Sequence, residues 1–270
     1  MYGLKPVPSK TGSYVWAKDS TFQNGSKLTR YKEPETHMPT HRRANGNTES
    51  VDNYLKAILY LGGREESRVT IKALAERLSV APASVTNMLQ KLAASPAPLV
   101  AYERHHGVVL SQAGKRRALE VVRHHRLIET FLYEVLDYPI EEVHEEAERL
   151  EHFISERFEE RIAAKLGNPK IDPHGHSIPT IEGEMAARES MLLADVVREG
   201  NFVIDSVSDR DAQNLRLIEA CGIAPGVRVR VRKSSAGGSD GYSVRVGRSA
   251  RAFDLSREVA RDVRIIRLAK

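Results

Sequence analysis

Two long stretches with the apolar spacing of an α-helix, residues 112–136 and 139–166, are separated only by Asp137-Tyr138-Pro139. Apolar residues recur every three or four positions in both stretches, which places them on one face of a helix. Pro139 suits the first turn of the second helix, and Gly167 suits its end. The apolar positions are Leu127, Phe131, Leu132, Val135 and Leu136 in the first stretch and Leu150, Phe153, Ile154, Phe158, Ile162 and Leu166 in the second. The pattern predicts two consecutive helices that pack by these faces.

The same two predicted helices carry histidines and glutamates at helical spacing. These residues are His125 and Glu129 in the first helix and His144, Glu148, Glu151 and His152 in the second. Neighbours three or four positions apart share one face of a helix. Two such faces packed together would form a mixed nitrogen and oxygen cage for a divalent transition metal ion. The alternative is a pair of solvated helix faces with ordinary charge pairs.

Three shorter helical patterns and a hairpin pattern precede them. The expected helices are residues 51–62 with Ser50 as N-cap and Gly62-Gly63 at the end, residues 71–78 with Thr70 as N-cap, and residues 82–94 with Pro82 in the first turn. Ser and Thr favour the N-cap, Pro the first turn and Gly the end of a helix. The short turn at 79–81 gives the last two helices the order of a DNA-binding helix-turn-helix. The hairpin at 99–110 would be its wing.

The third of these helices presents short polar side chains opposite its apolar face. The expected contacts to double-stranded DNA are Ser84, Thr86, Asn87, Gln90 and Lys91 of this helix and Arg104 of the hairpin. Asn and Gln suit adenine, whereas Lys and Arg suit phosphates.

The charge of the chain is unevenly distributed. Residues 51–118 carry ten Lys or Arg against five Asp or Glu, a net +5, which suits a phosphate backbone. Residues 119–225 carry eleven against twenty-three, a net −12, which suits a bound cation and would repel DNA.

The remaining segments differ in composition. Residues 1–47 lack periodicity and predict a disordered tail or an added leader, and residues 167–183 contain Pro169, Pro173 and Pro179 and predict a linker. After residue 194 there are short β patterns at 201–204, 227–231, 242–246 and 264–267 and one helix at 211–220, which together predict a small β-barrel. We therefore expect a mainly α protein with a small β domain. Its domains would be a winged helix-turn-helix at 48–115, a helical domain with the metal-binding candidates and a linker at 116–183, and a small β-barrel at 194–270.

The single cysteine, Cys221, excludes an internal disulfide and fits a reducing compartment. No apolar run reaches the length of about 18 residues that a membrane-spanning helix needs, and no apolar signal-peptide core is present. We expect a cytoplasmic protein with no membrane partner.

Three runs of residues resemble the diphtheria toxin repressor family of iron- and manganese-dependent transcriptional regulators. They are residues 125–132 (HRLIETFL), residues 142–152 (EVHEEAERLEH) and residues 172–179 (DPHGHSIP). The order of winged helix, metal-binding dimerisation helices, Pro-rich linker and SH3-like barrel is similar to that of the longer members.

The resemblance implies two metal sites per subunit. By position, the primary site would contain Glu148, Glu151 and His152, and the second site His125, Glu129 and His144. Iron-type members have a cysteine at the position of Glu148, whereas manganese-type members have a glutamate there, as this chain does. A carboxylate is harder than a thiolate and favours Mn²⁺ or Fe²⁺. Mn²⁺ is the expected metal, and Fe²⁺ is the alternative.

Two positions depart from the family pattern. The family takes a further primary ligand, Met or Asp, from the position of Asn53, and manganese-type members often have a Glu at the position of Lys56. The amide oxygen of Asn53, a water or a barrel carboxylate would then complete the site, since Asp52 projects about 100° away on an ideal helix. The barrel of longer members lends ligands to the second site, and Asp209 is the nearest candidate by spacing, with Asp211 next.

We interpret the chain as a homodimeric, metal-activated transcriptional repressor of metal-homeostasis genes that binds a palindromic operator. The second long helix would supply the dimer core with Phe153, Ile154 and Phe158. One alternative is a dinuclear metalloenzyme on a helical scaffold, which would use two Glu-x-x-His motifs. Another is a metal-independent winged-helix DNA-binding protein.

Overall fold

The computed structural model describes residues 7–8, 14–15, 47–63, 66–186, 188–234, 241–247 and 251–268. The chain separates into two units, residues 1–42 and residues 43–270. In the first unit, strands β1 (Val7–Pro8) and β2 (Tyr14–Val15) pair antiparallel. The expectation of a disordered tail or leader at 1–47 otherwise lies outside the described residues.

The second unit begins with the three predicted helices of the helix-turn-helix: α1 (Asn47–Gly62), α2 (Ile71–Leu78) and α3 (Pro82–Ala93). Thr70 caps α2, because its hydroxyl accepts a hydrogen bond from the Ala73 amide at 3.2 Å. The predicted start of α1 was wrong by four residues. Ser50 lies inside the first turn, where Glu49 also stands and where a carboxylate suits the positive end of the helix.

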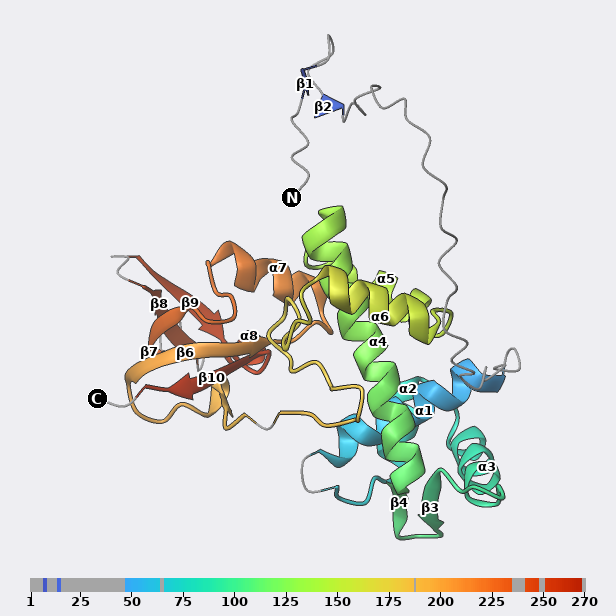
Figure 1. Ribbon diagram of the computed structural model, residues 1–270. Coiled ribbons are helices and arrows are strands. Elements are labelled where there is room, and N and C mark those ends of the chain that lie inside the picture. The colour runs from blue at the N-terminus through green and yellow to red at the C-terminus, as the bar shows by residue number, and fades with distance from the viewer. Residues whose placement is uncertain are drawn as a thin grey trace, which may run out of the picture. The chain divides into compact units, whose positions relative to one another are not determined.

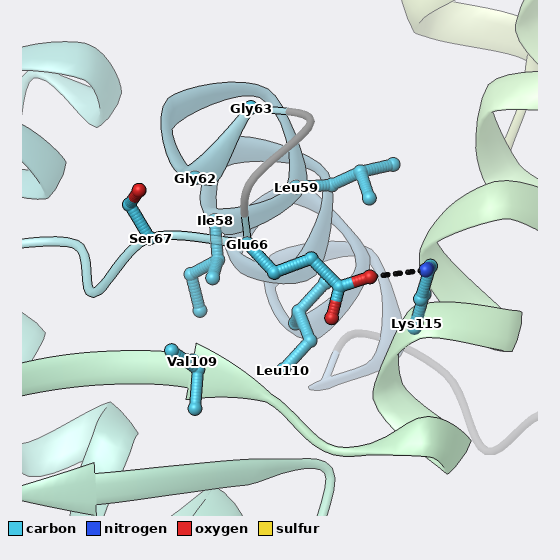
Figure 2. A pocket seen from close by; sticks show the side chains of 9 residues that line it. All are labelled: Ile58, Leu59, Gly62, Gly63, Glu66, Ser67, Val109, Leu110 and Lys115. Atoms are coloured by element: carbon cyan, nitrogen blue, oxygen red, sulfur yellow. Dashed lines mark hydrogen bonds and ion pairs between the residues drawn. The ribbon is translucent and has the colours of Figure 1, made fainter. Parts of the chain in front are cut away.

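The wing is a hairpin of β3 (Val100–Glu103) and β4 (Gly107–Leu110), paired in the register Val100 with Leu110. It presses against the start of the next helix at Gly114. A Cβ at this position would lie 1.9 Å from the carbonyl oxygen of Leu99, so only glycine allows this approach. Figure 2 shows a small pocket beside β4, where the carboxylate of Glu66 and the ammonium of Lys115 form an ion pair that holds the segment after α1 against this helix.

That helix, α4 (Gln112–Leu136), has the predicted bounds. Ser111 caps its first turn, and Asp137, with a left-handed φ of 55°, ends it. Figure 1 shows α4 running from the wing past α1 to α5 and α6. The longest helix thus connects the DNA-binding part of the chain to the helices that carry the remaining metal-binding candidates.

The single helix predicted over 139–166 was wrong. The structure contains two helices there, α5 (Val143–Leu150) and α6 (Glu156–Lys165), separated by residues 151–155. The break arises because Ser155 caps a new helix, its hydroxyl accepting from the Phe158 amide at 3.3 Å.

The apolar residues of this region do not all enter the core. Leu127, Ile162, Ala163 and Ile178 form one buried cluster of the helical domain. Leu150, Phe153 and Phe158, which have core spacing, are instead 38%, 77% and 49% exposed in the single chain. The fold of one chain therefore leaves these three apolar side chains exposed.

The C-terminal part is a six-stranded antiparallel sheet in the order β5-β10-β6-β7-β8-β9. Its elements are β5 (Met191–Leu192), η1 (Leu193–Asp195), β6 (Gly200–Val207), α7 (Ala212–Ala220), β7 (Arg228–Ser234), β8 (Gly241–Val246), β9 (Ala252–Ser256), α8 (Arg257–Ala260) and β10 (Val263–Arg267). The architecture fits the expected SH3-like barrel, although no pairing of β5 with β9 closes the sheet among the described residues. The sequence patterns did not predict β5, β9 and α8. The domain boundaries at 48–115, 116–183 and 194–270 stay a prediction.

The Pro-rich linker is packed tightly onto the barrel. Gly175 has a φ of 91°, and a Cβ there would lie 2.3 Å from the carbonyl oxygen of Asp205. The Val207 amide donates to the carbonyl oxygen of His174 at 2.9 Å, and Arg188 forms an ion pair with Asp205 at 2.6 Å. These contacts fix the linker against β6, the strand that leads to Asp209. Within the described residues, no helix is long and apolar enough to cross a membrane.

Candidate metal centre and DNA-binding surface

Four predicted ligands from three elements meet in one cluster, which we call the His144 cluster: His125 and Glu129 of α4, His144 of α5 and Asp209 of the loop after β6. His125 Nε2 lies 2.9 Å from Glu129 Oε1 and 3.1 Å from His144 Nδ1. His144 Nδ1 lies 3.3 Å from Glu129 Oε1 and 3.2 Å from Asp209 Oδ2. The structure thus brings Asp209, chosen by its spacing in the sequence, together with the ligands chosen by helical spacing.

Close packing of acids and imidazoles shifts the pKa of every group in the His144 cluster. Burial acts to lower the pKa of His125 and His144, but their carboxylate partners outweigh it. The pKa of His125 stands well above its ordinary value because of Glu129, and hydrogen bonds to Asp209 and Glu129 raise the pKa of His144 to about 9. Burial acts to raise the pKa of Glu129, but His125 holds it well below its usual range. The imidazoles and carboxylates of this cluster therefore stabilise each other's charged forms.

The His144 cluster fits a divalent transition metal ion. One ligand atom from each of its four residues lies within 4.8 Å of the others, giving two imidazole nitrogens and two carboxylate oxygens. Glu129 is fully buried, and its Oε2 has no hydrogen-bond partner among the described residues, since His174 Nδ1 lies 3.8 Å from it. A buried carboxylate oxygen without a donor is costly unless a cation satisfies it.

The other four predicted ligands, Glu148, Glu151, His152 and Asn53, lie in a second group. We call it the Lys56 cluster, because Lys56 of α1 contacts two of them. Lys56 Nζ lies 2.7 Å from Glu148 Oε1 and 2.7 Å from Glu151 Oε1. Burial acts to lower the pKa of Lys56, but Glu151 and Glu148 outweigh this effect and raise it. Lys56 also lowers the pKa of Glu148, against the effect of burial. The two carboxylates are therefore already paired with a cationic side chain.

His152 extends this cluster to the polar face of α1. Its Nε2 lies 3.1 Å from Asn53 Oδ1, and its Nδ1 lies 3.6 Å from Asp52 Oδ2. The expectation that Asp52 projects away from the site was wrong, since the two ring nitrogens of His152 reach two adjacent residues of α1. Asp52 is also paired with Arg117 of α4, at 2.6 Å from Nε to Oδ1.

His125 joins the two clusters. Its Nδ1 lies 2.6 Å from Glu151 Oε2, while its Nε2 faces Glu129. His125 also shares a possible ligand group with Glu148 and Glu151. The imidazole of His125 thus contacts a buried carboxylate of each cluster, and His144 Nε2 lies 3.9 Å from Glu148 Oε1 as a second, longer contact between the clusters.

Two further histidines have roles that the sequence did not indicate. His174 of the linker is fully buried, with Nδ1 3.8 Å from Glu129 Oε2 and Nε2 3.2 Å from the Ile140 carbonyl oxygen. The nearby carboxylate of Glu129 outweighs burial and raises the pKa of His174 to about 9. His124 is also fully buried, and its Nε2 lies 2.8 Å from Glu159 Oε2.

The predicted DNA-contacting residues lie on one side of α3 and on the wing. Ser84, Asn87, Gln90 and Lys91 are exposed along α3, while Val85, Leu89 and Leu92 are buried. Thr86 is half-buried, and its hydroxyl donates to the Pro82 carbonyl oxygen at 3.1 Å. Arg104 is exposed at the tip between β3 and β4.

Three family models match consecutive parts of the chain. Residues 47–108 match the N-terminal DNA binding domain of iron dependent repressors, and residues 111–180 match their metal binding and dimerisation domain. Residues 191–267 match the FeoA domain. The chain is also 31% identical to the iron-dependent repressor IdeR of Mycobacterium leprae, an alignment that covers 72% of this chain and 88% of that protein.

The chain belongs to the iron-dependent repressor family.

One further protein and one solved structure are also similar to this repressor. It is 33% identical to the HTH-type transcriptional regulator MntR of Bacillus subtilis, over 43% of this chain and 78% of that protein. A solved structure described as a manganese-dependent transcriptional repressor complex with manganese is 36% identical, with a TM-score of 0.72, and the match covers 81% of this chain and 100% of that one. The family is one of transcriptional repressors and not of enzymes. Membership therefore favours a metal-dependent repressor over both alternatives, the metalloenzyme and the metal-independent DNA-binding protein.

Proposed function

We propose that this repressor senses Mn²⁺ in the cytoplasm, with Fe²⁺ as the alternative metal, and controls genes of manganese or iron homeostasis as a homodimer on a palindromic operator. The observation that carries the proposal is the His144 cluster. It gathers donor atoms from α4, which leaves the wing, from α5 and from the barrel. Whether this one site holds a metal ion would therefore influence how firmly α4, α5 and the barrel are connected.

The residues of the cluster explain how this influence would reach DNA. His125 Nε2 and His144 Nδ1 lie 3.1 Å apart, and the carboxylates around them raise the pKa of both imidazoles. A bound divalent ion supplies a cation that nitrogen and carboxylate donors can share, which requires both imidazoles to lose their protons. His125 would then orient α4, and α4 carries the wing. Metal and DNA would tighten each other's binding by the same factor, typically about 5–150-fold.

The donor chemistry supports Mn²⁺ or Fe²⁺ over softer ions. The cluster offers imidazole nitrogens and carboxylate oxygens, and the only cysteine of the chain, Cys221, lies buried in the barrel core instead. Carboxylate ligands suit Mn²⁺, while imidazole suits iron as well. The solved structure with bound manganese is in line with this proposal.

The DNA-binding role is proposed for the exposed side chains Ser84, Asn87, Gln90, Lys91 and Arg104 and for the half-buried Thr86. Replacing Gln90 by Ala should reduce discrimination at one base pair by about 1–3 kcal/mol, because an amide reads a base edge. Replacing Lys91 by Ala should weaken binding to all DNA sequences alike. It should also reduce the slope of log affinity against log salt concentration by about 0.9, the value for one phosphate contact. A base-pair preference unchanged in Gln90→Ala would remove that residue from the set of base contacts.

The decisive experiment is a fluorescence anisotropy titration of the full chain on duplexes selected from the source genome in the presence of Mn²⁺. We expect binding at least five-fold tighter with Mn²⁺ than with chelator, and we expect His144→Ala to lose this difference. Glu145→Ala, at an exposed neighbouring position of α5, is the matched control and should keep it. Equal binding with metal and with chelator would contradict the proposed function. Parallel titrations with Fe²⁺ under anaerobic conditions decide between the two metals.

A further inference from the structure

The ammonium group of Lys56 occupies the centre of the Lys56 cluster. Its side chain is 8% exposed and reaches from α1 to Glu148 and Glu151 with two contacts of 2.7 Å. Contacts of this length between an ammonium and carboxylates are strong, charge-assisted hydrogen bonds. The oxygen atoms that Lys56 contacts are those that a metal ion between Glu148 and Glu151 would need.

The nearby negative charges also have partners without a metal. Glu151 lies against His125 Nδ1 through its second oxygen, at 2.6 Å, and Asp52 is paired with Arg117. The residue of α1 closest to His152 Nε2 is Asn53, a neutral amide. A divalent ion placed here would meet a fixed positive charge at a few ångströms, and like charges at that distance in a buried site repel strongly. The Lys56 cluster therefore does not fit a divalent ion, in contrast to the His144 cluster, in which imidazoles and carboxylates contact one another directly.

We propose that Lys56 is a built-in cation that takes the place of a metal ion between Glu148 and Glu151, so that the helical domain binds one divalent ion per subunit, in the His144 cluster. The inference rests on the proposed function and narrows it. Lys56 ties α1 of the DNA-binding domain to α5 permanently. The response to metal is then left to His125, Glu129, His144 and Asp209.

The test is a count of bound Mn²⁺ per subunit by elemental analysis of the full chain after equilibrium dialysis. We expect one ion in the wild type and none in His144→Ala. Lys56→Glu should bind two, because it removes the positive charge and adds a carboxylate. The matched control Lys72→Glu makes the same charge change at a position 86% exposed on α2 and should keep one ion.

A second variant makes the test independent of the folding of Lys56→Glu. Glu148→Gln should keep one ion, since its partner is Lys56 and not the metal. Two ions in the wild type, or loss of an ion in Glu148→Gln, would overturn the inference even where DNA binding depends on metal. No bound ion in the wild type would overturn the proposed function together with it.

Discussion

His144 of α5 lies 3.2 Å from Asp209 of the barrel, measured from Nδ1 to Oδ2. This contact is the point where the C-terminal domain enters the His144 cluster. Hydrogen bonding to His144 outweighs burial and lowers the pKa of Asp209, so the barrel contributes a negative charge.

Replacing Asp209 by Ala should therefore weaken Mn²⁺ binding by about 10–100-fold, the range seen when a group that supports a metal site is removed. Asp211, the other candidate from the sequence, should behave differently. Its Oδ1 accepts from the amides of Gln213 and Asn214 as the N-cap of α7, so Asp211→Ala should leave the affinity unchanged and lower the free energy of unfolding by about 1 kcal/mol. Isothermal titration calorimetry and urea denaturation separate the two effects. Equal Mn²⁺ affinities of the two variants would remove Asp209 from the site.

Metal binding should release protons and strengthen as the pH rises. The pKa of His144 is raised to about 9, so this imidazole carries a proton at neutral pH in the absence of metal, and the pKa of His125 is also raised well above its ordinary value. A metal binds only the unprotonated nitrogen. The affinity should therefore fall as the pH drops below about 9, by about ten-fold per unit for each proton displaced. Calorimetry at pH 7 in buffers of different ionisation enthalpy should report more than one proton released. A heat independent of the buffer would contradict this prediction.

The buried pair of His124 and Glu159 should be a major contributor to the stability of the helical domain. Glu159→Gln leaves His124 in a fully buried position without its ionic partner, which typically costs about 3 kcal/mol or more. Hydrogen bonding to Glu159 outweighs burial and raises the pKa of His124, and contacts to His124 and Arg123 outweigh burial and lower the pKa of Glu159. The His124 contribution is thus complete below its unfolded pKa of about 6.5 and is lost as the pH rises through the raised folded value. The Glu159 contribution is complete above its unfolded value of about 4.3 and is lost as the pH falls through the lowered folded value.

The difference in unfolding free energy between wild type and Glu159→Gln should consequently be largest between about pH 4.3 and 6.5. Urea denaturation at several pH values and one protein concentration measures it. Glu160→Gln, at the exposed neighbouring position, should show no such difference. A flat profile for Glu159→Gln would mean that the pair does not ionise as described.

The exposed apolar surface around Phe153 should be the dimer interface of the family's metal binding and dimerisation domain. Phe153→Asp should shift the protein from dimer to monomer and strongly weaken operator binding, because a charge replaces an aromatic side chain that is 77% exposed in the single chain. Val197→Asp, at a position equally exposed in the barrel domain, should leave the mass unchanged. Light scattering coupled to size-exclusion chromatography gives the mass directly. A dimer in both variants would place the interface elsewhere.

The sequence predicted the elements whose ends have their own local signals. Ser111 and Asp137 begin and end α4 by capping, and both bounds were correct. The break after Leu150 was missed because Ser155 lies within an uninterrupted helical apolar spacing, where its capping role competes with continuation of the helix. The strand β9 was also missed. It is only five residues long, and only two of its side chains, Phe253 and Leu255, are even partly buried.

The metal-binding candidates were predictable as sets along each helix, but their surroundings were not. Lys56 is separated by 92 residues from Glu148, and no local pattern relates them. His174 reaches Glu129 only because Gly175 allows the linker to approach the barrel backbone. Contacts of this kind depend on how distant segments pack. The periodicity of a single segment carries no information about that packing.

Gly114, which approaches Leu99 closely, and His125, eleven residues later, lie on the same uninterrupted helix, α4. Eleven residues make about three turns at 3.6 residues per turn, so the two residues project from almost the same side of α4. Adding or deleting a single residue between them would rotate one relative to the other by about 100°. The number of residues in this stretch of α4 is therefore under as strict a constraint as their identity, and length variation in relatives should be confined to other segments.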